Sequence, residues 1–215
     1  MIMRTNYDNQ LAELNRELTE MGGLCERIIS LAAGMLDGWE PSQAEQVQKT
    51  GAQIDEMERS IEAVCMRLLL RQQPVAGDLR RVSAALKMIT DLERIGDQAE
   101  DIAEIVPHMA GEEKQTHADI QAMAGHAIAM VTDSVNAYIR QDISLARDVL
   151  AHDDIVDADF VRIKKALIGA VAADPAQGEY ALDLLMIAKY FERIADHATN
   201  VAEWGIYGVT GTHEE

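Results

Sequence analysis

The sequence predicts an all-α protein of six long helices, arranged as two tandem antiparallel three-helix bundles with an internal pseudo-twofold repeat. Hydrophobic residues make up 48% of the 215 residues, aromatic residues only 4%, and there are 4 prolines, so the composition favours long helices with few breaks. Apolar residues recur every three or four positions along most of the chain. The second half of the chain also repeats the pattern of the first, which indicates two copies of one structural unit.

The first half contains three amphipathic segments separated by helix-breaking residues. They run approximately over residues 8–36, 42–71 and 76 or 78–106. Residues 1–7 are expected to be a loose lead-in. Trp39-Glu40-Pro41-Ser42 interrupts the first segment, and Ser42 is a candidate N-cap for the second helix. Gln72-Gln73-Pro74 ends the second helix and Pro107 the third, because proline and the residue before it disfavour helical backbone.

The same pattern restarts after the loop from Met109 to Glu113. Met21-Gly22-Gly23 matches Met123-Ala124-Gly125, and Val47 matches Val149, both at an offset of 102 residues. The offset falls to 99 in the last helix, so we expect the connection between the second and third helices to be three residues shorter in the second half. The predicted repeats span residues 8–108 and 115–210.

The strongest match between the halves is a twelve-residue segment in which seven positions are identical. It begins at Glu93 in the first half and at Glu192 in the second. In each copy three polar residues are spaced four apart, so their side chains span about 80° around the helix axis and lie on one face. These residues are Glu93, Asp97 and Asp101 in the first copy and Glu192, Asp196 and Asn200 in the second. Because Glu93 continues the apolar line through Leu86 and Ile89, its carboxylate approaches a packed surface and needs a cation or a donor.

The middle helices offer carboxylates that can face these strips. Asp153 and Asp157 are four residues apart in the second half, whereas the first half has Gly51 and Asp55 at the matching positions. Glu100 and Asp101, in place of a threonine and an asparagine, are candidates to compensate for the glycine. Two such helices can supply four or more oxygen ligands to a cation. The predicted metal ligands are Glu93, Asp97, Asp101, Asp55, Asp153, Asp157, Glu192, Asp196 and Asn200; the competing interpretation is a solvated acidic face.

The charge of the chain limits its partners. A formal net charge of −18 opposes binding to nucleic acid or anionic lipid, so we expect cations or basic protein surfaces as partners.

Cys25 and Cys65 match no metal or disulfide spacing and are expected to be buried free thiols, which suits a reducing cytosol. No segment looks like a signal peptide or a membrane span, so we expect no membrane insertion. The sequence contains neither a nucleophile paired with a base nor a Gly-rich phosphate loop, so we expect a protein that is not an enzyme.

Two segments resemble the signature of the PhoU family. One is Arg71-Gln72-Gln73-Pro74-Val75-Ala76-Gly77-Asp78-Leu79-Arg80, followed by Asp91-Leu92-Glu93-Arg94-Ile95-Gly96-Asp97; the other runs from Tyr190-Phe191-Glu192-Arg193 to Trp204. The resemblance covers nearly the whole chain and implies two three-helix bundles, often dimeric. It also implies a non-enzymatic cytoplasmic regulator of phosphate uptake and of the phosphate-starvation response. The implied partners are the ATPase of the phosphate-specific ABC transporter and a phosphate-sensing histidine kinase.

The resemblance also implies metal binding through E(D)-x-x-x-D motifs, sometimes as multinuclear clusters. In this chain the motifs fall on Asp153 and Asp157, on Glu192 and Asp196, and on Glu93 and Asp97. The metal would be a divalent or iron-type ion of unknown identity. The alternatives are a metal-storage protein or a metal-dependent hydrolase that uses the same strips, and a structural interaction bundle without metal. A catalytic metal would need an open coordination position beside a pocket.

Overall fold

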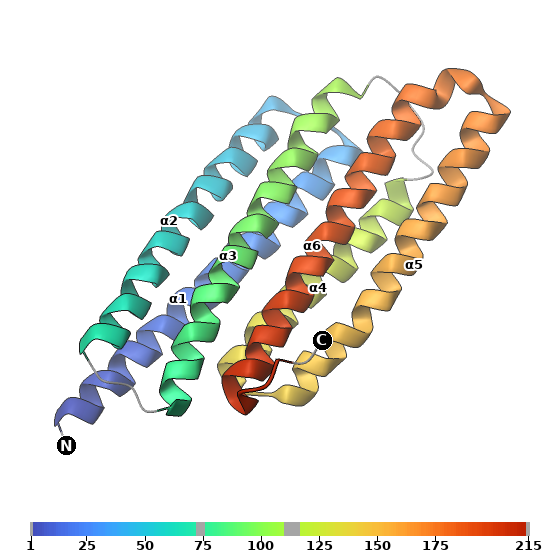
Figure 1. The fold of residues 1–215 in the computed structure, drawn as a ribbon. Helices are drawn as coiled ribbons and strands as arrows, with labels where there is room; N and C mark the ends of the chain where they lie inside the picture. Colours follow the sequence, from blue (N-terminus) through green and yellow to red (C-terminus); the bar gives the residue numbers. More distant parts are fainter. Residues whose placement is uncertain (1, 72–75, 110–116, 214–215) are drawn as a thin grey trace.

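Six long helices account for almost all of the computed structural model, which describes residues 2–71, 76–109 and 117–213 (Figure 1). These parts of the chain contain no strand. The α-helices are α1 (Ile2–Gly34), α2 (Pro41–Arg71), α3 (Ala76–Ile105), α4 (His117–Arg140), α5 (Ile143–Ala173) and α6 (Gly178–Thr210). Short 3-10 helices follow α1, α3 and α5 at Met35–Asp37, Val106–His108 and Pro175–Gln177.

The helices form two antiparallel three-helix bundles, one from each half of the chain. Helices α1, α2 and α3 contact one another, as do α4, α5 and α6. Figure 1 shows α3 and α6 side by side in the middle of the molecule, with α2 and α5 at its two outer edges. The two central helices run in opposite directions, and α1 and α4 also contact each other. The predicted fold class is therefore confirmed, and the repeated acidic segments lie on the central pair.

One continuous hydrophobic core runs through both bundles. Each helix contributes side chains with no solvent exposure, for example Leu14, Ile61, Leu92, Val131, Ile163 and Phe191 in chain order. Cys25 and Cys65 lie in this core as free thiols, as predicted, and burial raises the pKa of both to about 12. No helix in the described ranges has an apolar run long enough to cross a membrane.

Three local predictions are wrong. The helix already begins at Ile2, so residues 2–7 are not a loose lead-in. The second helix begins at Pro41 and not after Ser42, because proline is well suited to the first helical position and Gln43 accepts a hydrogen bond from the Glu40 backbone. Four residues separate the second and third helices in both halves, so the three-residue difference lies within the third helix before its acidic segment.

Residues at the helix ends determine where the helices of the second bundle begin and end, and a glycine lets two of them pack closely. Gln141 adopts a left-handed φ of 56° between α4 and α5, and the Asp142 carboxylate then accepts a hydrogen bond from the Leu145 backbone. A Cβ built on Gly205 of α6 would lie 3.6 Å from the Tyr138 Cα, at van der Waals distance, so α6 packs against the α4 backbone there. Gly211, with a φ of 79°, ends α6 in the left-handed conformation that glycine favours.

Candidate functional site

The first half brings five carboxylates together between α2 and α3. This first acidic cluster consists of Asp55, Glu58, Glu93, Asp97 and Glu100, all of them half-buried. Glu58 is an addition to the predicted residues, and it lies three residues after Asp55 and therefore on the same helix face. Burial, followed by repulsion from neighbouring carboxylates, raises the pKa of Glu58, Glu93 and Glu100.

Arg94 partly neutralises this cluster from within its own helix. Its Nη1 lies 2.7 Å from Asp97 Oδ2, and its Nε lies 3.5 Å from Glu93 Oε2. Burial and repulsion from Asp97 and Asp55 raise the pKa of Glu100. Asp55 forms an ion pair with Arg59 of its own helix, whereas Glu58 and Glu100 form none within the described part of the chain.

The second half has an equivalent group between α5 and α6. This second acidic cluster consists of Asp153, Asp157, Glu192 and Asp196, the four residues that the sequence predicted there. Burial and the neighbouring Asp196 and Asp157 raise the pKa of Asp153 to about 6. Glu192 forms an ion pair with Lys189. Lys189 also lowers the pKa of Asp196, which is nevertheless raised because burial is the larger effect.

The third residue of each strip lies at the contact between α3 and α6. Asn200 Nδ2 donates a hydrogen bond of 3.0 Å to Asp91 Oδ1, and His197 Nδ1 lies 2.9 Å from the same oxygen. The Tyr190 hydroxyl is hydrogen-bonded to Asp101 at the pseudo-symmetric place, since 91 and 101 match 190 and 200 at the offset of 99. Asn200 and Asp101 thus join the two halves, and their assignment as metal ligands stays a prediction.

All members of both clusters are carboxylates, and carboxylate oxygens are ligands that hard cations prefer. The side chains are not gathered around one point: among the residues described, no three Asp, Glu, His or Cys are arranged to hold a metal ion together. A cation would have to displace Arg59 and Arg94 from the first cluster and Lys189 from the second. On α2, a Cβ on Gly51 would overlap the Glu100 carboxylate, so this side chain lies against the α2 backbone.

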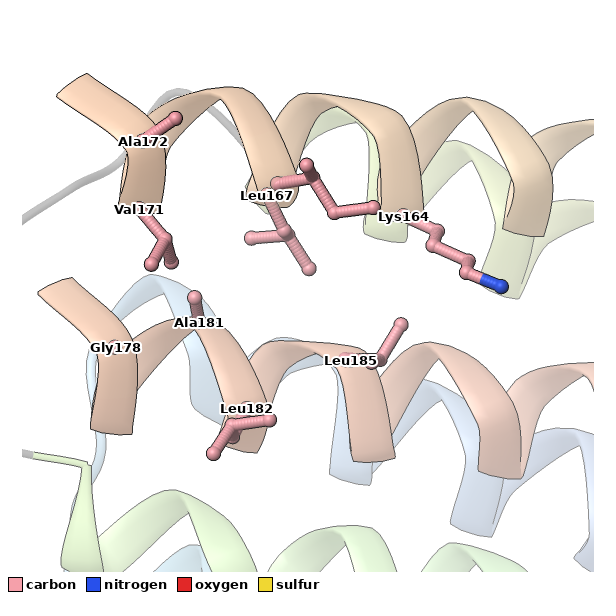
Figure 2. A pocket seen from close by; sticks show the side chains of 9 residues that line it. Lys164, Leu167, Val171, Ala172, Gly178, Ala181, Leu182 and Leu185 are labelled. Carbon is pink, nitrogen blue, oxygen red and sulfur yellow. The ribbon is translucent and has the colours of Figure 1, made fainter. Parts of the chain in front are cut away.

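Two surface hollows are lined by residues of these same helices. A cleft of about 570 Å³ opens between the two halves, and its lining includes Asp101, Glu104, Asp183 and Tyr190. A second hollow of about 480 Å³ is almost entirely apolar and lies where α5 and α6 end at their connection. Figure 2 shows leucine side chains of both helices and Val171 of α5 lining it, with the Lys164 amine pointing away at one end. Neither hollow contains the first or second acidic cluster.

Comparisons with known proteins agree with this architecture. The family model described as PhoU domain matches residues 18–106 and 120–205, which lie one in each half. A curated relative from Clostridium acetobutylicum, named phosphate-specific transport system accessory protein PhoU homolog, is 36% identical over 97% of this chain and 96% of its own length. A relative of the same name from Pseudomonas aeruginosa is 33% identical over 96% of this chain and 86% of its own.

Solved structures give the same result at the level of the fold. The crystal structure of PhoU from Pseudomonas aeruginosa superposes with a TM-score of 0.89 at 33% identity, covering 96% of this chain and 100% of that one. The phosphate transport system regulatory protein PhoU from Streptococcus pneumoniae superposes with a TM-score of 0.88 at 27% identity, covering 97% and 99%.

Proposed function

The chain belongs to the PhoU family, and on this basis we propose that it is a non-enzymatic accessory protein of phosphate transport. The observation that carries this proposal is the match of both repeats to PhoU proteins along nearly their whole length. The protein would regulate phosphate uptake and repress the phosphate-starvation response through contacts with other proteins.

The proposed partners are the ATPase of the phosphate-specific ABC transporter and the phosphate-sensing histidine kinase, reached from the cytoplasm. Relatives are named as accessory proteins of the transport system, which supports the first partner. The net charge of −18 favours partners with basic surfaces. We also propose that the protein is a homodimer, which sedimentation equilibrium would test; a monomer at micromolar concentration would contradict that part of the proposal.

A complementation experiment tests the regulatory function. The chain is expressed in a Pseudomonas aeruginosa strain that lacks its own PhoU, with a reporter of the phosphate-starvation response and ample phosphate. We expect the reporter to fall toward its level with the native PhoU restored. A reporter as active as with an empty vector, although the chain is expressed and folded, would refute the proposal. Copurification with each separately tagged partner then tests the proposed contacts.

We further propose that the two acidic clusters bind divalent or iron-type cations. Pairs of carboxylates on facing helices support this proposal, as does the burial of Asp153 and Glu100 among other carboxylates, which raises the pKa of both. Elemental analysis of protein purified without chelator or metal-affinity resin provides the test. Metal should be lost in part from the Glu192→Ala, Asp196→Ala double variant.

The matched control for that experiment lies on the same helix. Glu179 and Asp183 are also a Glu and an Asp four residues apart on α6, but neither belongs to the second acidic cluster. The Glu179→Ala, Asp183→Ala variant should therefore keep its metal. Equal metal content in both double variants and the wild type would refute binding at the second cluster.

A further inference from the structure

The apolar hollow between α5 and α6 is open to solvent although large aliphatic side chains line it. Ile168 of α5 and Leu182 of α6 are 60% and 63% exposed, and Met186 follows Leu182 one turn along α6 at 46%. Figure 2 shows Val171 of α5 pointing across the hollow toward α6. Exposed apolar side chains around a concave centre mark a place where another molecule binds, because its binding removes them from water.

The first repeat shows that the fold does not require this surface. On the middle helix, Lys164 corresponds to Glu62 at the offset of 102. On the last helix, counting back from the acidic segments at the offset of 99, Leu182 corresponds to Ser83. The same three-helix bundle thus forms with an acid and a hydroxyl at these positions. The lysine and the exposed leucine are therefore not needed for packing.

The α5 side of the hollow has the opposite charge to the chain as a whole. Residues 160–173 include three basic residues and no acidic one, in a chain whose formal net charge is −18. Arg162 is paired with one aspartate of α5 and one of α4. Lys164 and Lys165 are exposed and form no ion pair within the part of the chain that the structure describes. Their amines are available to a negatively charged partner.

Shape and charge together indicate the kind of partner. A concave apolar surface between two helices accepts the apolar ridge of a third helix, whose anchor side chains recur at i, i+4 and i+7. Lipid is disfavoured because it binds protruding apolar faces, and because the net charge of −18 repels anionic headgroups. A second copy docked by the same surface would bring two sets of these lysines to one interface, where they would repel each other.

We propose that the apolar hollow binds an amphipathic helix of another protein that carries acidic side chains beside its apolar ridge. The ridge covers Ile168 and Leu182, and the acids meet Lys164 and Lys165. This partner is opposite in charge to the basic surfaces proposed above. The contact is therefore a separate one, and its failure would leave the proposed function in phosphate transport unaffected.

Two fluorescein-labelled helical peptides of about 18 residues test the proposal. Both have leucine at i, i+4, i+7 and i+11, and the flanking positions are glutamate in one and lysine in the other. Binding to the full chain is followed by fluorescence anisotropy. We expect the acidic peptide to bind about tenfold more tightly than the basic one, and less tightly at high salt. The net charge of −18 by itself favours the basic peptide, so equal affinities or the opposite order would overturn the inference.

A double variant tests whether the acidic peptide binds in the hollow. Leu182→Gln with Ile168→Gln should abolish its binding. The matched control is Met66→Gln with Leu70→Gln, which changes exposed apolar residues of the first repeat and should leave binding as in the wild type. All four side chains are exposed, so both variants should fold, and thermal unfolding checks this. Equal losses in the two variants would contradict docking in the hollow.

A charge reversal gives a readout that a change in stability does not produce. The Lys164→Glu, Lys165→Glu variant should bind the basic peptide more tightly than the acidic one, which exchanges the order found with the wild type. An unchanged order would show that these lysines do not meet the acids of the partner, and it would overturn the inference.

The Leu182→Gln, Ile168→Gln variant also distinguishes the other occupants. Vesicles of phosphatidylcholine and phosphatidylglycerol that bind the wild type but not this variant would show that the hollow faces lipid. A wild-type dimer that becomes a monomer in this variant, by sedimentation equilibrium, would show that a second copy covers it. Either result overturns the inference, whereas an unchanged mass and no vesicle binding support it.

Discussion

Replacing Asp153 by Asn should stabilise the metal-free protein at neutral pH. Asp153 is half-buried, and burial together with Asp196 and Asp157 raises its pKa from 3.8 to about 6. The folded protein therefore holds a proton on this carboxyl more tightly than the unfolded chain does. Ionising the group at pH 7 costs folding free energy, and an uncharged amide removes that cost.

The size of the effect follows from the pKa shift. An increase of about two units corresponds to about 3 kcal/mol at 1.36 kcal/mol per unit. Solvent still reaches the carboxyl and screens its neighbours, so we expect about 1 kcal/mol to be realised. The penalty is absent below the unfolded pKa, grows as the pH rises from about 4 to about 6, and is constant above that range. Roughly half of it should be present at pH 5.

Urea denaturation in chelator at pH 5 and at pH 7 measures this directly. The stability gain of Asp153→Asn over the wild type should about double between the two pH values. Glu56→Gln, which removes an exposed negative charge from α2, controls for the net charge of the chain. A gain equal to that of Glu56→Gln, or one that does not change with pH, would refute the reasoning. With saturating Mn²⁺ the sign should reverse, because the variant lacks a proposed ligand.

Three further predictions test the packing and the contact between the halves. Phe191→Ala should cost about 3–5 kcal/mol in urea denaturation because the ring is fully buried, and a loss below about 1 kcal/mol would contradict that burial. Asp142→Ala should cost about 1 kcal/mol by removing the N-cap of α5, whereas Asp142→Asn should retain most of the stability; equal losses would argue against capping. Asp91→Ala leaves His197 and Asn200 without their shared acceptor and should cost about 1–2 kcal/mol. Combined with His197→Ala it should cost less than the sum of the single changes, and strict additivity would contradict the contact.

Part of the site could be predicted because it depends on position along single helices. The four-residue spacing of Glu192 and Asp196 places both side chains on one helix face whatever the helix packs against. The same spacing on the middle helix identified Asp153 and Asp157 as facing candidates, and the structure brings both close to Asp196. The sequence did not predict which basic side chains would join them. Arg94 pairs with Asp97 of its own helix, and Lys189 pairs with Glu192 three residues further on.

The same limit applies to the third member of each strip. Asn200 shares the spacing of Glu192 and Asp196, yet its amide reaches Asp91 on the other half of the molecule. A shift of four residues turns a side chain about 40° around the helix, enough to move it from one neighbouring helix toward the next. Spacing gives that angle, but the positions of the neighbouring helices decide what lies there.

Sequence alone determined the six helices, the duplication and the face of each helix that carries the acids, because these follow from local backbone periodicity. Only the tertiary structure decided that Glu100 lies over Gly51, since this depends on how closely α2 and α3 approach. That approach is set by packing: a Cβ on Gly96 would lie 3.1 Å from Ile54 Cδ1, so the absence of a side chain there lets Ile54 sit against the α3 backbone. The separation of two helices is a property of both packed surfaces together, and neither helix encodes it by itself.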